Sequence, residues 1–398
     1  MKVLYINPVF LSYRIPFYKK LKELFNNDFY VLYSTKRYIK KGVEDLLPQI
    51  KMALGSNAIE FKTELIYDVN KKSFNKYDKE KGRKIPFTLG LIRNILKIHP
   101  DVLISEGFYQ WTPFAVIYSF IMRAKLFIGY ERTLHTERNT GILLTTYRKL
   151  INLFVTGYLV NGTETQKYLI SIGVSPQKIF IGGMNADSRG LREAIANYPL
   201  SQKKIFKQQF INTNDNGLIY LFSGQIIERK GLIYLLNAWK KHILVYPNDR
   251  LIIIGGGSLL KKYQTLFSTN NSIYLEGKIP YNEVYKYYAI ADIFILPTLE
   301  DNWSLVIPEA MSCGLPVATS IYNGCHVELV KKGYNGITFD TYKEDTIINA
   351  LDYFHHVDLK KFGSNSIELE KQFDTDHCAY RVFNYIFRSI PVHFPVAY

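Results

Sequence analysis

The chain has 398 residues, 47% of them hydrophobic and 21% charged, which excludes a disordered or fibrous protein and predicts two globular domains. Its cysteines, Cys313, Cys325 and Cys378, are odd in number and form no C-x-x-C pair, which argues against a disulfide framework or a zinc ribbon and predicts a reducing compartment. The net charge of +15 is concentrated in residues 1–200, which hold 30 Lys and Arg against 16 Asp and Glu, so a polyanion (nucleic acid or an anionic membrane surface) is the expected partner of this half.

Neither an export signal nor a membrane-spanning segment is expected. Met1-Lys2 is followed by an apolar run that ends at Asn7-Pro8 and is too short for a signal peptide. The longest apolar stretch, Phe114–Met122, ends at Arg123, below the ~18 residues that a spanning helix needs. The sequence therefore predicts a cytoplasmic protein, soluble or peripheral on the inner membrane face. The densest basic stretch, Lys71–Lys84, is either a docking site or a solvated loop.

Short runs of Val, Ile, Leu, Phe and Tyr alternate with amphipathic runs of helical length along the first half. Continuous apolar runs are typical of strands buried on both faces of a parallel sheet, and their alternation with helices predicts βαβ units. The expected strands are Lys2–Ile6, Phe29–Tyr33, Asp101–Ser105, Leu126–Tyr130, Tyr158–Asn161 and Lys178–Ile181. The expected helices are Ile15–Leu24, Pro86–Ile98, Thr112–Met122, Leu143–Phe154 and Thr163–Ile172.

The second half repeats this alternation more clearly. Its expected strands are Ile219–Gly224, Leu251–Gly255, Ile273–Glu276, Ile293–Pro297 and Pro316–Ser320, and its expected helices are Leu232–Val245, Leu259–Leu266, Asn282–Ala291, Leu305–Ser312 and Val327–Lys332. The polar segment Asn197–Asn216 lacks a strong period and marks a hinge near residue 200. The predicted architecture is α/β, with two doubly wound domains, 1–200 and 201–372, facing across a cleft. Ligands in such sheets bind beyond the carboxyl ends of the strands.

A glycine turn and a lysine follow the first strand of the second half. Ser223-Gly224-Gln225 ends that strand, and Glu228-Arg229-Lys230-Gly231 opens the next helix. Backbone N–H groups, a helix dipole and one cation would converge there, which suits a phosphate group. The alternative is an ordinary strand-to-helix connection with exposed basic residues.

Three consecutive glycines, Gly255-Gly256-Gly257, follow the next strand. The third glycine of a dinucleotide-binding G-x-G-x-x-G would fall on Leu260, so that motif is incomplete. The glycines still indicate that backbone passes close to a ligand or a neighbouring helix. We favour the wall of a nucleotide site.

Acidic residues surround the start of a later helix. Glu300 and Asp301 occupy the loop before it, and Glu309 lies within it, eight positions after Asp301. The helix begins near Ser304 or Leu305, whose free N–H groups would point into the same space. Carboxylates bind hydroxyl groups and N–H groups bind phosphates, so the arrangement suits a sugar nucleotide. Helix capping by Asp301 or Ser304 is the alternative.

Other patterns predict no further chemistry. Asp374-Thr375-Asp376 has the form of a metal-binding D-x-D, but it precedes the helical run Cys378–Phe387, where capping is the better interpretation. His355-His356 ends a helix without a third nearby ligand, so no metal site is predicted. The G-x-S-x-G of serine hydrolases is absent.

The second half resembles the retaining glycosyltransferases of family 4, of the bacterial surface-polysaccharide type, which have the two-domain GT-B fold. The resemblance runs from Ile219 to Asp340, through SGQIIERKGLIYLL, LIIIGGGS, IYLEGKIPYNEVYKYYAIADIFILPT, EDNWSLVIPEAMSCGLPVATS and a G-x-x-x-E at Gly324–Glu328 followed by GYNGITFD. The first half matches more loosely, through NPVFLSYRIPFYKKL and YERTLHTER. The resemblance also implies that residues 373–398 form a C-terminal helix that packs back toward the first domain.

The resemblance implies a role for each matching residue. Lys230 should hold the donor diphosphate, Glu309 the ribose hydroxyls, and Asp301 the donor sugar, with His135 as a fourth catalytic position. The other implied donor-binding residues are Gly224, Gln225, Arg229, Gly257, Lys278, Ile279, Glu300, Asn302, Trp303, Ser304 and Leu305. The implied acceptor-side residues are Arg14, Glu106 and Glu131. The family usually has Arg where this chain has Gln225, and Arg229 is the candidate to replace it.

By resemblance, the reaction is a retaining, front-face transfer from a UDP- or GDP-linked sugar to a glycan or polyprenyl-pyrophosphate-linked acceptor in surface-polysaccharide synthesis. It uses no metal and no cofactor, because Lys230 and helix dipoles neutralise the departing diphosphate. The basic half would receive the acceptor, which makes an anionic membrane surface the expected partner in place of nucleic acid. Two alternatives stay open: a sugar-nucleotide epimerase with the same fold, and a non-catalytic polyanion-binding protein, although no nucleic-acid module is recognisable.

Overall fold

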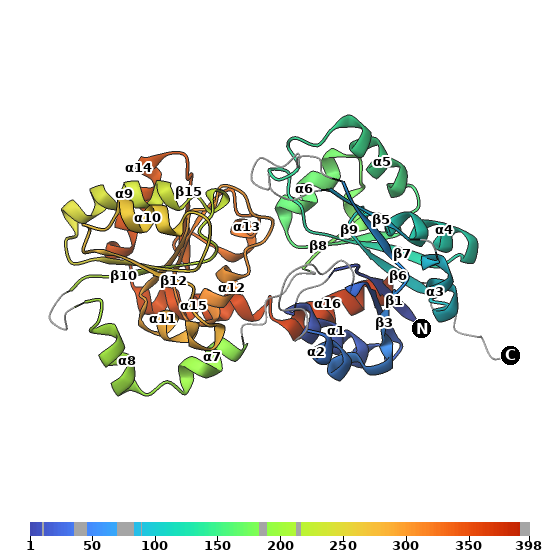
Figure 1. Ribbon diagram of the computed structural model, residues 1–398, viewed down its shortest axis with the longest axis horizontal. Helices are drawn as coiled ribbons and strands as arrows, with labels where there is room; N and C mark the ends of the chain where they lie inside the picture. The colour runs from blue at the N-terminus through green and yellow to red at the C-terminus, as the bar shows by residue number, and fades with distance from the viewer. Residues whose placement is uncertain are drawn as a thin grey trace. The chain divides into compact units, whose positions relative to one another are not determined.

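The computed structural model describes residues 1–9, 12–35, 46–69, 83–88, 90–182, 189–211 and 216–390. The chain divides into two compact units: unit 1 contains Met1–Asn185 and Thr375–Tyr398, and unit 2 contains Ala186–Asp374. Each unit is built around its own parallel sheet, with helices on both faces (Figure 1). These are the two doubly wound α/β domains that the sequence predicts.

Seven parallel strands form the sheet of unit 1, in the order β3-β2-β1-β6-β7-β8-β9. They are β1 (Val3–Ile6), β2 (Phe29–Tyr33), β3 (Ala58–Glu60), β6 (Val102–Glu106), β7 (Lys125–Tyr130), β8 (Gly157–Val160) and β9 (Ile179–Ile181). Every residue of β1 and β8 is buried, which explains their continuous apolar sequence. The sequence analysis missed β3, because this edge strand has three residues that are all half-buried.

Two groups of helices cover opposite faces of this sheet. One face packs against α3 (Leu91–Ile98), α4 (Thr112–Met122), α5 (Ile142–Asn152) and α6 (Thr163–Ser171), and the other against α1 (Arg14–Leu24), α2 (Leu46–Leu54) and α16 (Thr375–Arg388). Short helical turns occupy Gly55–Asn57 (η2) and Pro176–Lys178 (η3). The sheet therefore has a hydrophobic core on each side.

The last helix, α16, belongs to unit 1 although the chain has already passed through unit 2. Its Val382 and Ile386 are buried in the core that also contains α1. Phe383 packs on Phe25 with ring centroids 4.9 Å apart, and Tyr385 stacks on Phe180 at 4.7 Å. The expected return of the C-terminal helix to the first domain is confirmed.

An antiparallel pair interrupts the alternation in unit 1: β4 (Leu65–Val69) pairs with β5 (Arg83–Phe87). The expected helix over Pro86–Ile98 is therefore wrong at its start, since Pro86 lies in β5. The helix follows Gly90, whose left-handed backbone (φ 90°) separates strand from helix. Most of the basic stretch Lys71–Lys84 lies outside the described residues, so its role stays a prediction.

Six parallel strands form the sheet of unit 2, in the order β12-β11-β10-β13-β14-β15. They are β10 (Ile219–Ser223), β11 (Arg250–Ile254), β12 (Ile273–Gly277), β13 (Ile293–Leu296), β14 (Val317–Ser320) and β15 (Gly336–Phe339). The strand order reverses between β10 and β13, which lie side by side although about seventy residues separate them. Such a reversal leaves an open crevice at the carboxyl ends of the two strands.

Helices cover both faces of this sheet as well (Figure 1). They are α7 (Arg189–Ala196), α8 (Leu200–Lys207), α9 (Leu232–Val245), α10 (Leu260–Leu266), α11 (Val284–Ile290), α12 (Val306–Ser312), α13 (His326–Leu329), α14 (Glu344–Tyr353) and α15 (Leu359–Lys371), with short turns η4 (Glu228–Lys230), η5 (Tyr281–Glu283) and η6 (Phe354–His356). The helix α9 has the bounds that its apolar stripe predicts. Among the described residues, no helix has the length and apolar character needed to cross a bilayer.

The boundary between the units lies at Asn185/Ala186, earlier than the hinge that the sequence places near residue 200. The segment expected as a polar hinge contains α8, and its aromatic residues pack on unit 2. Tyr198 meets Tyr285 edge to face at 5.3 Å, and Phe206 meets Tyr287 in the same way at 5.1 Å. These aromatic contacts assign α7 and α8 to the second unit.

Candidate active site

The turn after β10 is held against the loop after β13, because these two strands are neighbours. Gly231 ends η4 with a left-handed backbone (φ 64°), and a Cβ at this position would lie 2.1 Å from the carbonyl oxygen of Pro297. The N–H of Leu299 donates to the carbonyl oxygen of Arg229 at 2.8 Å. The basic turn and the acidic loop of the sequence thus meet at the strand reversal.

A buried ion pair is the centre of this arrangement. Lys230 is 9% exposed, and its Nζ lies 2.5 Å from Oδ2 of Asp301. The guanidinium of Arg229 lies 3.6 Å from the same oxygen and donates to the carbonyl oxygen of Glu300 at 2.7 Å. Burial acts to raise the pKa of Asp301, but the charges of Lys230 and Arg229 outweigh it and hold that pKa below its ordinary value.

The second predicted acid, Glu309, has a different environment. Burial raises the pKa of its carboxyl to about 7, and the neighbouring Tyr288 hydroxyl offsets part of that rise. No cation contributes to this shift, in contrast to Asp301. The two carboxylates, eight positions apart in the sequence, therefore differ in electrostatics: Asp301 stays charged, whereas Glu309 exchanges its proton near neutral pH.

The helix that follows the acidic loop begins at Val306, one residue after the expected Leu305, and its preceding N–H groups are not all free. The N–H of Ser304 donates to Oδ1 of Asn323 at 3.3 Å, so the expected free donor is engaged. Trp303 is buried against Phe373, with ring centroids 6.0 Å apart. These two residues position the loop, and their contact with a donor stays a prediction.

The glycines after β11 approach backbone, as the sequence indicates, but the neighbour is a loop of the protein itself. A Cβ on Gly255 would lie 1.8 Å from the carbonyl oxygen of Gly224, and one on Gly257 would lie 2.3 Å from that of Ile226. Gly256, between them, would meet nothing closer than 3.5 Å, at Cβ of Lys278. The glycines therefore join the loops after β10 and β11. A nucleotide on their outer side stays a prediction.

The remaining donor-side predictions have known places but no tested role. Lys278 is exposed and Ile279 half-buried in the loop after β12. Gln225 lies between β10 and η4, while Asn302 lies beside Asp301 in the acidic loop. Arg229, rather than Gln225, reaches the acidic loop, which makes it the side chain able to supply a second cation beside Lys230.

The three acceptor-side predictions come together in unit 1. Arg14, 5% exposed at the start of α1, donates a hydrogen bond to Glu131 after β7 and lies 3.6 Å from Glu106 at the end of β6. The Tyr5 hydroxyl donates to Glu106 at 2.5 Å. Burial raises the pKa of Glu106 to about 7, although the charge of Arg14 opposes the rise. A small cavity is lined by Arg14, Glu131 and the strand-end residue Asn161.

Within that cavity, the side-chain N–H₂ of Asn161 has no hydrogen-bond partner, although the residue is 3% exposed. An unpaired buried amide is costly and suits a ligand oxygen. His135, the fourth predicted catalytic residue, lies in the turn between β7 and α5, half-buried. The sequence analysis did not find Asn161 or Tyr5; Asn161 directly follows β8, and that position is a signal that could have indicated it.

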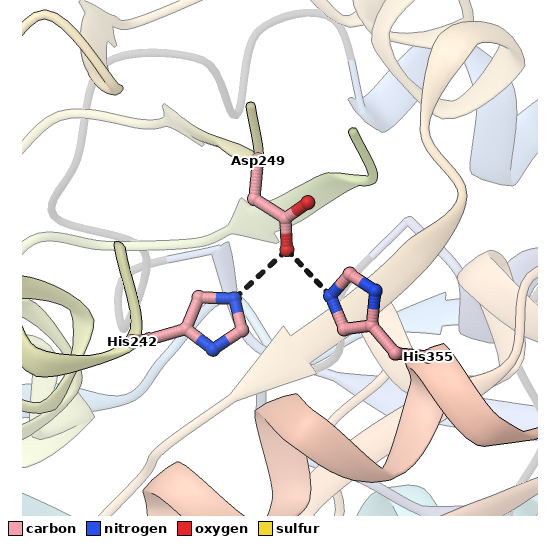
Figure 2. A group of neighbouring side chains, drawn as sticks. All are labelled: His242, Asp249 and His355. Carbon is pink, nitrogen blue, oxygen red and sulfur yellow. Dashed lines mark hydrogen bonds and ion pairs between the residues drawn. The ribbon is translucent and has the colours of Figure 1, made fainter. Parts of the chain in front are cut away.

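A separate cluster in unit 2 corrects the expectation that His355 has no ligand-type neighbours. Oδ2 of Asp249 accepts hydrogen bonds from Nε2 of His242 and Nε2 of His355, each at 2.8 Å (Figure 2). Among the described residues, this is the one group of three side chains that could hold a metal ion. The other carboxylate oxygen accepts from the N–H of Leu218 at 2.8 Å, so every Asp249 oxygen is satisfied within the protein.

This cluster lies at the amino end of β11, the opposite edge of the sheet from Lys230 and Asp301. His242 lies in the last turn of α9, and His355 lies in η6 with its ring stacked on that of Tyr246, the centroids 3.6 Å apart. The cluster ties α9, the start of β11 and η6 together. These hydrogen bonds give the cluster a packing role in unit 2.

Residues 201–368 match the glycosyl transferases group 1 family. The chain is 28% identical over 185 residues to UDP-Gal:alpha-D-GlcNAc-diphosphoundecaprenol alpha-1,3-galactosyltransferase of Escherichia coli, covering 45% of each protein. It is 27% identical over 158 residues to lipopolysaccharide 1,2-N-acetylglucosaminetransferase of Salmonella typhimurium, covering 36% of this chain and 41% of the relative. Both alignments thus span less than half of the relative's own length.

Solved structures share the whole architecture. Anabaena HepE in complex with UDP has a TM-score of 0.73 at 16% identity, covering 98% of this chain and 100% of that one. The apo form of the lipopolysaccharide outer core galactosyltransferase WaaB has a TM-score of 0.71 at 14% identity, covering 98% and 100%. These likenesses establish the fold. They match the GT-B fold that the sequence predicts, and the matched family domain, residues 201–368, lies within unit 2.

Proposed function

We propose that this protein is a retaining glycosyltransferase that moves a hexosyl-type sugar from a nucleoside-diphosphate donor to a glycan or polyprenyl-pyrophosphate-linked acceptor in surface-polysaccharide synthesis. The observation that carries the proposal is the buried Lys230–Asp301 pair at the reversal between β10 and β13. The E. coli relative, named for transfer from UDP-Gal to a diphosphoundecaprenol-linked sugar, supports both the donor and the acceptor class. UDP-sugars are therefore the first donors to test, and GDP-sugars the second.

In this proposal Lys230 stabilises the negative charge that develops on the departing diphosphate. An ammonium group has three N–H donors, so Lys230 can keep its bond to Asp301 while it donates to phosphate oxygens. Asp301 compensates the charge of the buried lysine, and Arg229 supplies a second cation 3.6 Å from the same carboxylate. Because these side chains carry the positive charge, we assign no role to a metal or cofactor, and transfer should persist in EDTA.

Glu309 binds the ribose hydroxyls in this proposal. A carboxylate accepts two hydroxyl hydrogen bonds, and those bonds favour the charged form of a group whose pKa is about 7 in the free protein. On the acceptor side, Arg14, Glu131 and the unpaired amide of Asn161 line a polar cavity in unit 1 that can orient an acceptor hydroxyl or phosphate. The inner membrane face is the proposed location, because a polyprenyl-linked acceptor lies there.

The experiment is a thermal-shift screen with UDP-glucose, UDP-galactose, UDP-N-acetylglucosamine and GDP-mannose, followed by transfer assays with the stabilising donor. Lys230→Ala should remove the shift and lower transfer by on the order of 10²-fold or more. The matched control is Lys262→Ala, an exposed lysine of α10, which should leave both unchanged. Wild-type turnover by the Lys230 variant would contradict the proposal.

Two product analyses test the finer parts of the proposal. The anomeric configuration of the product, measured by NMR, should equal that of the donor, and inversion would refute the retaining assignment. Incubation with the donor alone should give slow hydrolysis at most. Formation of an epimeric sugar nucleotide would favour an epimerase instead.

A further inference from the structure

Helix α4 leaves part of the longest apolar stretch of the chain in solvent. Ile117, Phe120 and Ile121 follow one another at helical spacing on one side of α4, and their exposed fractions lie between 49% and 72%. The opposite side of the helix packs on the sheet through Ala115 and Tyr118. The exposed stripe is therefore a second apolar side of α4, which the described residues of unit 1 leave largely open to solvent.

Helix α5 has a stripe of the same kind. Leu143, Leu150 and Leu153 recur at intervals of seven and three residues and are 56% to 86% exposed. Phe154, one turn after Leu150, meets Phe120 of α4 edge to face, with ring centroids 6.1 Å apart. This contact joins the two stripes into one surface, the α4–α5 apolar face, formed by Ile117, Phe120, Ile121, Leu143, Leu150 and Leu153.

The exposed charges that α4, α5 and their connections carry have one sign. Between Gly107 and Gly162 the sequence contains two acids, Glu131 and Glu137, and both are used internally. Glu131 accepts a hydrogen bond from Arg14, and Glu137, 7% exposed, pairs with Arg148 at 2.8 Å. The exposed charges of α4, α5 and their connections in the described structure are therefore basic, and include Arg123, Arg138 and Lys149.

We propose that the α4–α5 apolar face is a membrane-docking surface that inserts into the headgroup region of an anionic bilayer. Contiguous exposed apolar side chains of this kind mark an interaction site, and basic residues beside them attract anionic lipids. A second copy of the chain would bring two basic faces together, whereas an anionic lipid surface complements them. Only the purpose of this surface rests on the proposed function: docking would bring unit 1 to a lipid-linked acceptor.

The test is flotation of the full-length protein with two kinds of vesicle, phosphatidylglycerol mixed with phosphatidylcholine, and pure phosphatidylcholine. The wild-type chain should partition at least about ten-fold more strongly onto the anionic vesicles. A quadruple variant, F120S/I121S/L150S/L153S, should reduce that partitioning about ten-fold or more, because it removes the inserting groups. A charge variant, R123E/K149E, should lose the preference for anionic vesicles.

The matched control is L244S/V245S, which replaces two equally exposed apolar residues at the end of α9 in unit 2 and should bind vesicles like wild type. Circular dichroism and the UDP-glucose thermal shift verify that each variant is folded. Wild-type binding by the quadruple variant would overturn the proposal, as would a solution dimer that this variant dissociates. Vesicle binding without any sugar-nucleotide binding would refute the proposed function and leave this inference standing.

Discussion

Lys230 and Asp301 carry opposite charges in a place with little access to water, so each makes the other's burial tolerable. Their side chains are 11% and 13% exposed, and Arg229 is the second cation beside the carboxylate. Removing one partner of such a pair leaves an uncompensated charge, which costs more than the intact pair contributes. Glu300, the neighbouring acid of the same loop, uses its backbone carbonyl to hold Arg229.

Asp301→Ala should therefore lower the free energy of unfolding by about 3 kcal/mol, because it leaves Lys230 buried without its carboxylate. The measurement is urea unfolding followed by circular dichroism at neutral pH. Glu300→Ala is the matched control and should change stability by less than about 1 kcal/mol. Equal effects of the two substitutions would mean that the acids are interchangeable.

Glu309 links the stability of unit 2 to pH. Its folded pKa of about 7 lies above the ordinary value of 4.5, so the contribution of its protonation to stability is complete below that ordinary value and is lost as pH rises toward 7. Glu309→Gln cannot titrate. Relative to this variant, wild type should lose about 2 kcal/mol of unfolding free energy between about pH 5.5 and 7.5. Urea unfolding of both proteins at the two pH values measures it, and parallel curves would contradict the prediction.

At the residue scale, the sequence predicted which side chains meet where each of them follows the end of a strand. Lys230 and Asp301 follow strands that a doubly wound sheet places side by side, and they do meet. Tyr288, which lies beside Glu309, was missed because its position depends on how α11 packs. His355 was also misjudged, since Asp249 is 106 residues away along the chain and only the folded sheet brings the two together.

The elements of unit 2 meet through backbone as much as through side chains. The loops after β10 and β11 touch at Gly224 and Gly255, where the N–H of Gly255 also bonds to β12. Gly255 has a φ of 138°, outside the range of ordinary side-chain-bearing residues. The connection after β10 carries Arg229 and Lys230. Its close approach to the loop after β11 therefore holds the candidate donor site in place.

Gly255→Ala should destabilise the protein by at least about 2 kcal/mol, because its Cβ would collide with the carbonyl oxygen of Gly224 at 1.8 Å. Its neighbour supplies the control: Gly256→Ala would meet nothing nearer than 3.5 Å and should change stability by less than about 1 kcal/mol. Thermal unfolding of the two variants side by side makes the comparison. If Gly255→Ala left the stability unchanged, the two loops would be able to separate without cost.

Buried strands and long helices were predictable, and short edge elements were not. Strand β2 and helices α4 and α9 have the predicted bounds, because each combines an apolar run or stripe with clear end signals. Strands β3 and β15 were missed: β3 is half-buried at a sheet edge, and β15 begins with Gly336. The pair β4 and β5 was missed because it is antiparallel and breaks the strand–helix alternation on which the prediction depended.

On the scale of the whole molecule, charge and fold divide at the same places. Unit 1, including its returning C-terminal segment, holds 30 Lys and Arg against 15 Asp and Glu, whereas unit 2 holds 20 against 20. The sequence alone located this asymmetry in residues 1–200, close to the boundary between the units. The α4–α5 apolar face could not be predicted, because sequence periodicity does not reveal which apolar side of a helix lacks a neighbour.

The integrity of unit 1 should depend on a helix that is distant in sequence. Ile386 is fully buried between α16 and the sheet, so Ile386→Ala should lower the stability of unit 1 by about 2–4 kcal/mol. Asn384→Ala, on the exposed side of α16, is the control and should change it by less than about 1 kcal/mol. Hydrogen exchange of β1 and β2 amides reports unit 1 directly. Unchanged protection in the Ile386 variant would make α16 dispensable.

The position of α16 also sets the order in which the protein can fold during its synthesis. Residues 186–374 are contiguous, so unit 2 can complete its sheet as soon as that stretch has left the ribosome. The seven-stranded sheet of unit 1 is synthesised first, yet the part of one face that α16 covers stays exposed until Ile386 has emerged. The part that is translated first is therefore the part that matures last, and its bare apolar face is where a chaperone would bind the nascent chain.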